Sequence, residues 1–196
     1  MILPTKEFKV YKYPELGTKA KEKVKQEYLE HIDPYDFTYN VIEDLKNIGL
    51  KNLRSYYSLS YCQSDGLCLV GHIDFDEISP ELKKIFYKDF LLSDHKILKN
   101  LKEHSRIEFN HIGQYYHRYS VDINIYLDRN LSTKKSKNHK KTANKLIKNI
   151  TDWYMHLCSE YEMWGYKFFY DVTDKNVEEF YDAMEYKFLE DGTIFN

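Results

Sequence analysis

Three residues whose side chains suit metal chemistry stand at alternate positions in one segment of the chain. His72, Asp74 and Asp76 would lie on one face of a β-strand, because successive side chains of a strand point to opposite faces. Joined by His111 or His117 from a neighbouring strand, they could bind a divalent metal and support a metal-dependent nuclease. Polar side chains on the solvent-facing side of a half-exposed sheet explain the same spacing without a metal. We therefore predict no metal site and no cofactor, and keep the nuclease as an alternative.

Motifs of known catalytic classes are absent from the sequence. Ser58, Ser60 and Ser64 lack the flanking glycines of a nucleophile elbow, and no glycine-rich loop is present to bind phosphate. The eight histidines are scattered along the chain. The sequence therefore predicts no catalytic residue and favours a binding protein over an enzyme.

An aromatic-rich segment, Leu53–Phe75, has the pattern of a β-hairpin. Two runs with alternating character flank the stretch Cys62–Gly66, in which an Asp-Gly pair supplies the positive φ that a short hairpin turn needs. The prediction is the central hairpin of an antiparallel sheet. Gln63, Ser64 and Asp65 at its tip are candidate protein-binding residues, because exposed loops often carry recognition. The needs of the turn explain Asp65 and the following glycine without any partner.

A basic block lies between Leu131 and Lys148, with seven lysines and no acidic residue. Its first part, about residues 131–138, is predicted to be a loop, and the helix that follows would place several lysines on one face. Such a stripe can neutralise phosphates without reading sequence, so the alternative function is a nucleic-acid-binding regulator or antitoxin. A solvated loop and helix start explain the block equally well. The candidate nucleic-acid-binding residues are Lys134, Lys135, Lys137, Lys140, Lys141, Lys145 and Lys148, and the shared helical face would carry Lys137, Lys141, Lys145 and Lys148.

The C-terminal third carries the opposite charge. From Asp171 to Asp191 there are eight acidic residues and two lysines, and a helix is predicted over residues 176–186. This acidic helix could occupy the nucleic-acid groove of a host enzyme, or serve only to keep its exposed face hydrated. Opposite charges on the two segments could also drive self-association into a homodimer. The candidate protein-binding residues of this segment are Glu178, Glu179, Tyr181, Asp182 and Glu185.

The elements that would position these residues come in mixed groups of strands and helices. Asp33-Pro34 and Ser79-Pro80 each combine an N-cap residue with proline at the first helical position, which marks a helix start. Because strands and helices do not alternate strictly, the pattern favours one α+β domain over residues 1–196, with a mainly antiparallel sheet of about five strands and helices packed on it. The predicted helices are about 19–32, 34–49, 80–90, 93–103, 138–165 and 176–186, and the predicted strands outside the central hairpin are 8–13, 106–112, 118–127, 166–172, 187–189 and 193–195.

The composition fits a globular protein that carries an interaction surface. Of the 196 residues 42% are hydrophobic, and 29 basic residues balance 31 acidic ones, which argues against a bulk nucleic-acid binder. The 19 tyrosines suit a core with wet edges or a protein-binding face. Three cysteines without CxxC spacing predict reduced thiols. Charged residues follow Met1–Pro4 directly and no long apolar run occurs, so we expect neither signal peptide nor membrane span, and a cytoplasmic protein.

Five segments of the chain carry a family likeness: Tyr13–Leu16, Ala20–Lys23, Tyr56–Gly66, Tyr119–Ile123 and Glu185–Phe195. They resemble a family of small phage and prophage proteins, whose members are sometimes labelled antitoxins. Ser64 stands where that family usually has glycine. Because many phage accessory genes counter host defence, the resemblance implies a protein that binds and inhibits a host immune effector by stoichiometric contact in the cytoplasm of a bacterial host. The partner that it suggests first is a Cas nuclease, which would make the chain an anti-CRISPR protein.

Overall fold

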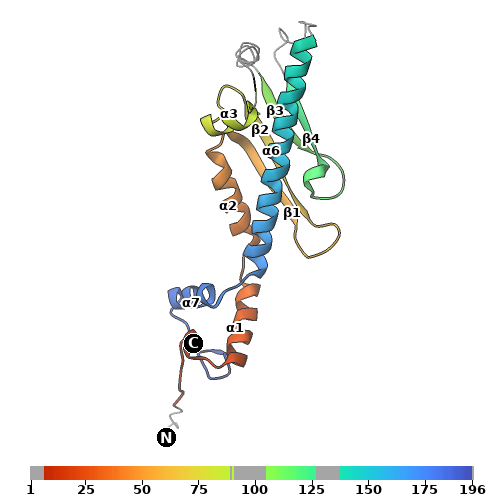
Figure 1. The fold of residues 1–196 in the computed structure, drawn as a ribbon. Coiled ribbons are helices and arrows are strands. Elements are labelled where there is room, and N and C mark those ends of the chain that lie inside the picture. Colours follow the sequence, from red (N-terminus) through yellow and green to blue (C-terminus); the bar gives the residue numbers. More distant parts are fainter. Residues whose placement is uncertain (1–6, 89, 91–104, 127–136, 196) are drawn as a thin grey trace. The chain divides into compact units, whose positions relative to one another are not determined.

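The computed structural model describes residues 7–88, 90, 105–126 and 137–195. Contacts between Cα atoms divide the chain into two compact units, unit 1 with residues 1–34 and 166–196 and unit 2 with residues 35–165. Among the described residues, unit 2 holds a four-stranded antiparallel sheet with helices packed on it, and unit 1 holds short helices and a small hairpin (Figure 1). The predicted α+β class is confirmed, whereas the single domain stays a prediction.

The sheet of unit 2 is formed by β1 (Leu50–Ser58), β2 (Gly66–Asp74), β3 (Arg106–His111) and β4 (Val121–Tyr126), in that order and all antiparallel. The predicted hairpin is present as β1 and β2, but β1 lies at an edge of the sheet and only β2 is internal. The two strands predicted over 106–112 and 118–127 are β3 and β4. A short 3₁₀ helix, η2 (Arg118–Ser120), replaces the start of the second.

The connection between β1 and β2 spans residues 59–65 and is longer than the predicted tight turn. Positive φ occurs at Tyr61 (57°) and not at Asp65 or Gly66, so the predicted role of the Asp-Gly pair is wrong. Gly66 is needed for space instead, because a Cβ there would lie 2.6 Å from His117 Cδ2 and 2.9 Å from the carbonyl oxygen of Tyr116. The start of β2 therefore packs directly against the connection between β3 and β4.

Helices α2 (Pro34–Lys46) and α3 (Pro80–Phe86) begin where the proline signals predict. The hydroxyl of Ser79 accepts a hydrogen bond from the amide of Leu82 at 3.2 Å and thereby caps α3. This helix ends before the predicted residue 90. The buried side chains of α2 are Phe37, Val41 and Leu45.

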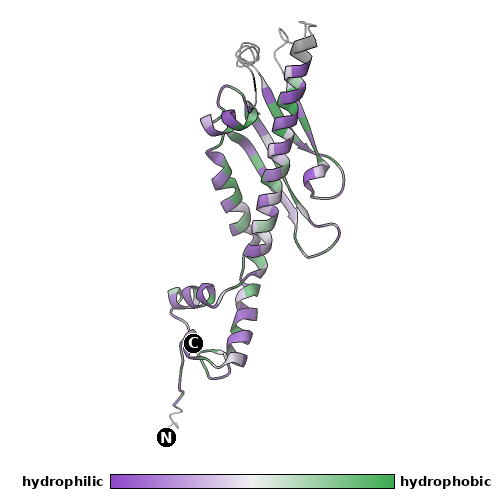
Figure 2. Ribbon diagram, in the orientation of Figure 1, coloured by the Kyte–Doolittle hydropathy of each residue, from purple (hydrophilic) through white to green (hydrophobic). Residues whose placement is uncertain are grey.

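Helix α6 (Lys137–Tyr170) continues through the segment that was predicted as a strand over 166–172, and that prediction is wrong. Gly165 does not end the helix. A Cβ at Gly165 would come within 2.4 Å of Leu59 Cδ1, so close packing against the β1–β2 connection requires the glycine. Hydrophilic and hydrophobic residues alternate along α6, as expected for a helix with one buried side (Figure 2). The buried side chains of α6 include Leu146, Ile150, Tyr154 and Cys158.

Tyr154 of α6 completes the hydrogen bonding of β2. Register between β2 and β3 stops at the pair of Gly71 with Phe109, which leaves Leu69 without a partner residue on β3. The Tyr154 hydroxyl donates to the carbonyl oxygen of Leu69 at 3.0 Å and accepts from its amide at 3.2 Å. The Tyr154 ring stacks on Phe109, with centroids 4.9 Å apart. Burial raises the pKa of this hydroxyl, which keeps it protonated and able to donate.

Unit 1 combines helices α1 (Thr18–Glu30) and α7 (Asp174–Ala183) with the hairpin of β5 (Lys187–Phe188) and β6 (Ile194–Phe195). The hairpin confirms the prediction made from the Asp-Gly pair before β6, where Gly192 has a φ of 83°. The core of unit 1 comprises Tyr13, Leu16, Ala20, Val24, Val177, Tyr181 and Phe188.

The strand predicted over residues 8–13 is wrong. It is reduced to a single bridge between Tyr11 and Phe188, in which each amide donates to the other residue's carbonyl oxygen. A 3₁₀ helix, η1 (Tyr13–Glu15), follows at once. Pro14 favours this outcome, because proline has no amide to donate and its fixed φ suits the start of a helical turn.

Some predicted features lie outside the described residues, namely the helix over 93–103 and most of the lysine-rich loop over 131–138. Within the part of the chain that the structure describes, no helix is long and apolar enough to cross a membrane. The three cysteines are free, as predicted, with Cys62 exposed and Cys68 and Cys158 buried.

Candidate functional site

Asp65 organises the loop between β1 and β2. Its Oδ2 accepts hydrogen bonds from the amides of Ser60 at 2.7 Å and Cys62 at 3.0 Å. Its Oδ1 accepts from the hydroxyls of Ser60 at 3.2 Å and Ser58 at 3.3 Å. The carboxylate of Asp65 is therefore used to hold the loop, while the neighbouring Gln63 and Ser64 are exposed.

Side-chain hydrogen bonds fasten the connection between β3 and β4. His111 Nε2 lies 3.0 Å from the carbonyl oxygen of Tyr115, and the amide of Tyr119 donates to His117 Nδ1 at 3.2 Å. Arg118 donates through Nη1 to Glu162 Oε2 of α6 at 2.9 Å. The side chains of this pair are largely shielded from solvent, at 23% and 20% exposure, so the contact holds η2 against α6.

The two connections meet at one end of the sheet. Between them lies an open hollow of about 750 Å³, lined by residues 62–65 of the first connection and by Tyr115, His117 and Ser120 of the second. Several large apolar side chains are exposed on the same two connections, two of them to about 70%, Tyr61 (71%) and Tyr119 (70%). We call this set the tyrosine surface; it consists of Tyr61, Ile112, Tyr115, Tyr116 and Tyr119.

Contacts between rings order part of the tyrosine surface. Tyr56, His111 and Tyr116 form a group in which each pair of ring centroids lies 5.5–5.9 Å apart. His117 stacks on Tyr119 at 4.8 Å, and the guanidinium carbon of Arg118 lies 5.4 Å from the centre of the same tyrosine ring. Two of the exposed rings, Tyr116 and Tyr119, are therefore held in place by neighbouring side chains.

Sequence reasoning located one side of the hollow and none of the five residues of the tyrosine surface. Gln63, Ser64 and Asp65 were predicted as candidates and do line the hollow. The tyrosines of the second connection were missed, although the aromatic run from Tyr115 to Tyr119 shortly after Gly113 is a usable signal. Its significance depends on the close approach of two connections that lie about fifty residues apart in the sequence, which no local pattern reveals.

Of the alternating His72, Asp74 and Asp76, the first two lie on β2 beside ion-pair partners, and Asp76 lies in the exposed turn that follows the strand. Asp74 accepts from Lys51 Nζ at 3.0 Å and from Arg106 Nε at 2.8 Å, while His72 Nε2 lies 3.8 Å from the same carboxylate. Burial raises the pKa of Asp74, but the hydrogen bonds from these two cations outweigh it and hold the pKa below the ordinary value. Across the described ranges, no group of three or more histidine, cysteine or acidic side chains could hold a metal ion.

The basic block is only partly described. Lys134 and Lys135 lie outside the described residues, and α6 begins at Lys137, so the predicted helix is confirmed for the later lysines. Lys148 forms an ion pair with Asp152, and Lys145 Nζ lies 4.9 Å from the centre of the Phe90 ring. These two lysines have partners within the protein, and nucleic-acid binding by the block stays a prediction.

The acidic candidates of α7 belong to unit 1 and are also partly engaged. Asp182 pairs with Lys12 at 3.2 Å, and Glu179 pairs with Lys175 at 3.5 Å. Tyr181 is 1% exposed and belongs to the core, so its ring is not available at the surface. Among the acidic candidates, Glu179 and Asp182 are exposed on α7, Glu178 is half-buried on the same helix, and Glu185 is exposed just after the helix ends.

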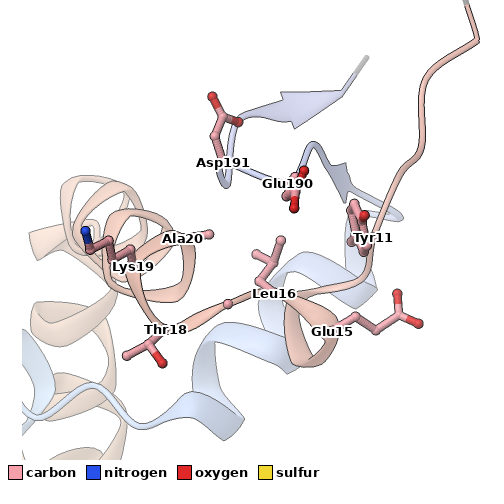
Figure 3. Close-up of a pocket in the computed structure, with 9 residues that line it drawn as sticks. Tyr11, Glu15, Leu16, Thr18, Lys19, Ala20, Glu190 and Asp191 are labelled. Atoms are coloured by element: carbon pink, nitrogen blue, oxygen red, sulfur yellow. The ribbon is translucent and has the colours of Figure 1, made fainter.

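A second hollow, in unit 1, lies between the start of α1 and the turn before β6 (Figure 3). Leu16 and Ala20 point into it, whereas Thr18 points away. The carboxylate of Asp191 accepts from the amide of Thr193 at 2.9 Å, and this hydrogen bond lowers the pKa of Asp191 below its ordinary value. The polar groups around this hollow do not converge on one point, unlike those of a small-molecule site.

Comparisons with known proteins identify one family. Neither the curated proteins nor the solved structures include a match to the chain. The family model that matches is the domain of unknown function DUF8835, over residues 35–164. This range coincides with unit 2 to within one residue, so it contains the whole sheet and the tyrosine surface. Because the match covers more than half of the sequence, the chain belongs to the DUF8835 family.

Proposed function

We propose that the chain is a binding protein that contacts another protein through the tyrosine surface. The observation that carries this proposal is the gathering of five large exposed side chains on two connections at one end of the sheet. Tyrosine is enriched in protein interfaces because its ring buries apolar area while its hydroxyl keeps a hydrogen bond. A gathering of large exposed apolar side chains often marks a protein–protein interaction site.

Pre-organisation supports binding by contact rather than by refolding. The loop of residues 59–65 is held by hydrogen bonds to the carboxylate of Asp65, and η2 is held by the ion pair of Arg118 with Glu162. Side chains that are already ordered lose less conformational entropy when a partner covers them. Binding at this surface would therefore need no large rearrangement of unit 2.

The class of partner that we propose is a host defence effector, with a Cas nuclease as the first candidate. This part of the proposal rests on the resemblance of Tyr56–Gly66 and the other segments to phage accessory proteins. The mode of action is stoichiometric inhibition, in which the chain occupies a surface that the effector needs. The alternative of a nucleic-acid-binding regulator or antitoxin rests on the basic block alone.

The test combines capture with inhibition. The full chain is used to capture partners from lysate of a bacterial host, with and without nuclease treatment, and the captured effector is then purified and assayed. We expect a protein that survives nuclease treatment and whose activity falls to zero near a one-to-one ratio. A partner that disappears with nucleic acid would favour the alternative function.

Matched variants locate the contact. Tyr61→Ser with Tyr119→Ser removes two rings of the tyrosine surface, and we expect at least a tenfold weaker inhibition, because interface tyrosines often contribute 2 kcal/mol or so each. The control is Tyr35→Ser with Tyr39→Ser, a stacked and exposed pair on α2 with centroids 6.2 Å apart. Equal effects of the two double variants would count against this surface.

A further inference from the structure

The two edges of the sheet in unit 2 are protected to very different degrees. An unpaired strand edge presents free amides and carbonyls, and proteins usually blunt such edges with bulges, prolines or lysines. β1 has these devices: its register with β2 shifts between Lys51 and Arg54, and Asn52 within the shift has a φ of 51°. Addition of a further strand at β1 is therefore disfavoured by the irregular backbone and by the positive charges of Lys51 and Arg54.

β4, at the opposite edge, has none of these devices. Its six residues pair with β3 in unbroken register, from Val121 with His111 to Tyr126 with Arg106. The strand contains no proline, lysine or arginine. Within the residues that the structure describes, no further strand pairs with β4, which is the outermost strand of the sheet (Figure 1). This edge has the features of a site for β-strand addition.

The side chains of β4 specify what kind of strand can be added. Ile123 and Ile125 pair with Phe109 and Ile107, which are buried, and are themselves half-buried. Asp122, Asn124 and Tyr126 lie on the other face, because side chains alternate along a strand. An added strand must therefore place apolar residues on the first face and polar residues on the second. The sequence of β4 itself meets both conditions.

We propose that a second copy of the chain adds its β4 to this edge, antiparallel and across a two-fold axis at Asn124. In this register Ile123 faces Ile125 of the other copy, and Asp122 faces Tyr126. The two Asp122 carboxylates are then four residues apart along the strands, about 14 Å at ~3.4 Å per residue, which exceeds the screening length of about 8 Å at physiological salt. A two-fold axis at Ile123 would halve that separation to about 7 Å, so repulsion favours the axis at Asn124.

The experiment measures the mass of the full chain by sedimentation velocity over a range of concentrations. We expect the mass to rise from 23.7 kDa toward twice that value. Asn124→Lys and Asn124→Glu each place like charges opposite one another at the axis, and each variant alone should remain at the mass of one chain. An equimolar mixture of the two should form the dimer again, because the charges are then opposite.

Asn110→Lys serves as the control. Asn110 is exposed on the same polar face but lies on the internal strand β3, where it pairs with Asp122. We expect this variant to dimerise like the wild type. Far-UV circular dichroism of each variant checks that it is folded.

Three results would overturn the proposal. The first is a wild-type chain that keeps the mass of one copy up to about 0.1 mM, a concentration at which contacts with a Kd of micromolar strength are saturated. The second is an Asn124→Lys variant that dimerises as well as the wild type, which would place the axis elsewhere. The third is a mixture of the two charged variants that stays monomeric.

Discussion

The hydroxyl of Tyr154 gives the sharpest test of how the sheet of unit 2 is held together. Tyr154→Phe removes that hydroxyl and leaves the buried amide and carbonyl of Leu69 without it. An unsatisfied buried backbone group costs about 1–3 kcal/mol. The ring still packs on Phe109, so no cavity larger than an oxygen atom forms. We expect a loss of about 3 kcal/mol in the free energy of unfolding and a fall of roughly 6–12 °C in Tm.

The assay is urea unfolding followed by far-UV circular dichroism at pH 7. Tyr119→Phe is the control, because it removes a hydroxyl from a ring that is 70% exposed. That change should alter the free energy of unfolding by less than about 0.5 kcal/mol. A loss below about 1 kcal/mol for Tyr154→Phe, or equal losses for the two variants, would refute the role of this hydroxyl.

The same hydroxyl predicts the alkaline behaviour of the protein. Burial raises the pKa of Tyr154 in the folded state above the value of about 10 that it has in the unfolded chain. Its contribution to stability is therefore complete below about pH 10 and is lost as the pH rises through the folded pKa. In Tyr154→Phe the free energy of unfolding should fall less steeply with pH above about 10 than in the wild type.

Three further predictions use the same unfolding assay. The hydroxyl of Tyr181 is buried without a hydrogen-bond partner among the described residues, so Tyr181→Phe should raise the free energy of unfolding by about 1 kcal/mol, and a loss instead would reveal a partner. Gly66→Ala should cost about 2 kcal/mol or more and weaken partner binding, because the new Cβ would lie 2.6 Å from His117; an unchanged stability would contradict this packing. Asp74→Asn should destabilise the protein at pH 7, and its difference from the wild type should vanish as the pH falls well below about 4, because the lowered pKa of Asp74 contributes stability only above its folded value.

Elements that depend on neighbouring residues in the sequence could be predicted. Ser79 and Pro80 mark the start of α3 because a hydroxyl cap and a fixed φ act within one turn. The closing hairpin and the buried face of α2 follow from the same kind of local signal. Local signals of this kind were sufficient to predict the α+β class correctly.

Features that depend on distant contacts could not be predicted. The predicted helix ended at Gly165, and Gly66 was interpreted as a turn residue. At each position, however, a side chain from elsewhere in unit 2 occupies the space that a Cβ would need. The tyrosine surface has the same origin, since it exists only where the loop after β1 meets the connection after β3. A single sequence does not indicate which loops become neighbours.

The two hydrogen bonds of Tyr154 have a structural consequence for the end of β3. If the register between β2 and β3 continued, His111 would lie opposite Leu69. The hydroxyl of Tyr154 already makes the hydrogen bonds with the amide and carbonyl of Leu69 at that position. The amide and carbonyl of Leu69 are thereby satisfied although the last residues of β3 do not pair with β2. The ring of His111 packs instead against Tyr56 and Tyr116. Tyr154, a core residue of α6, therefore influences where the pairing of β3 with β2 ends and which rings the last residue of β3 contacts.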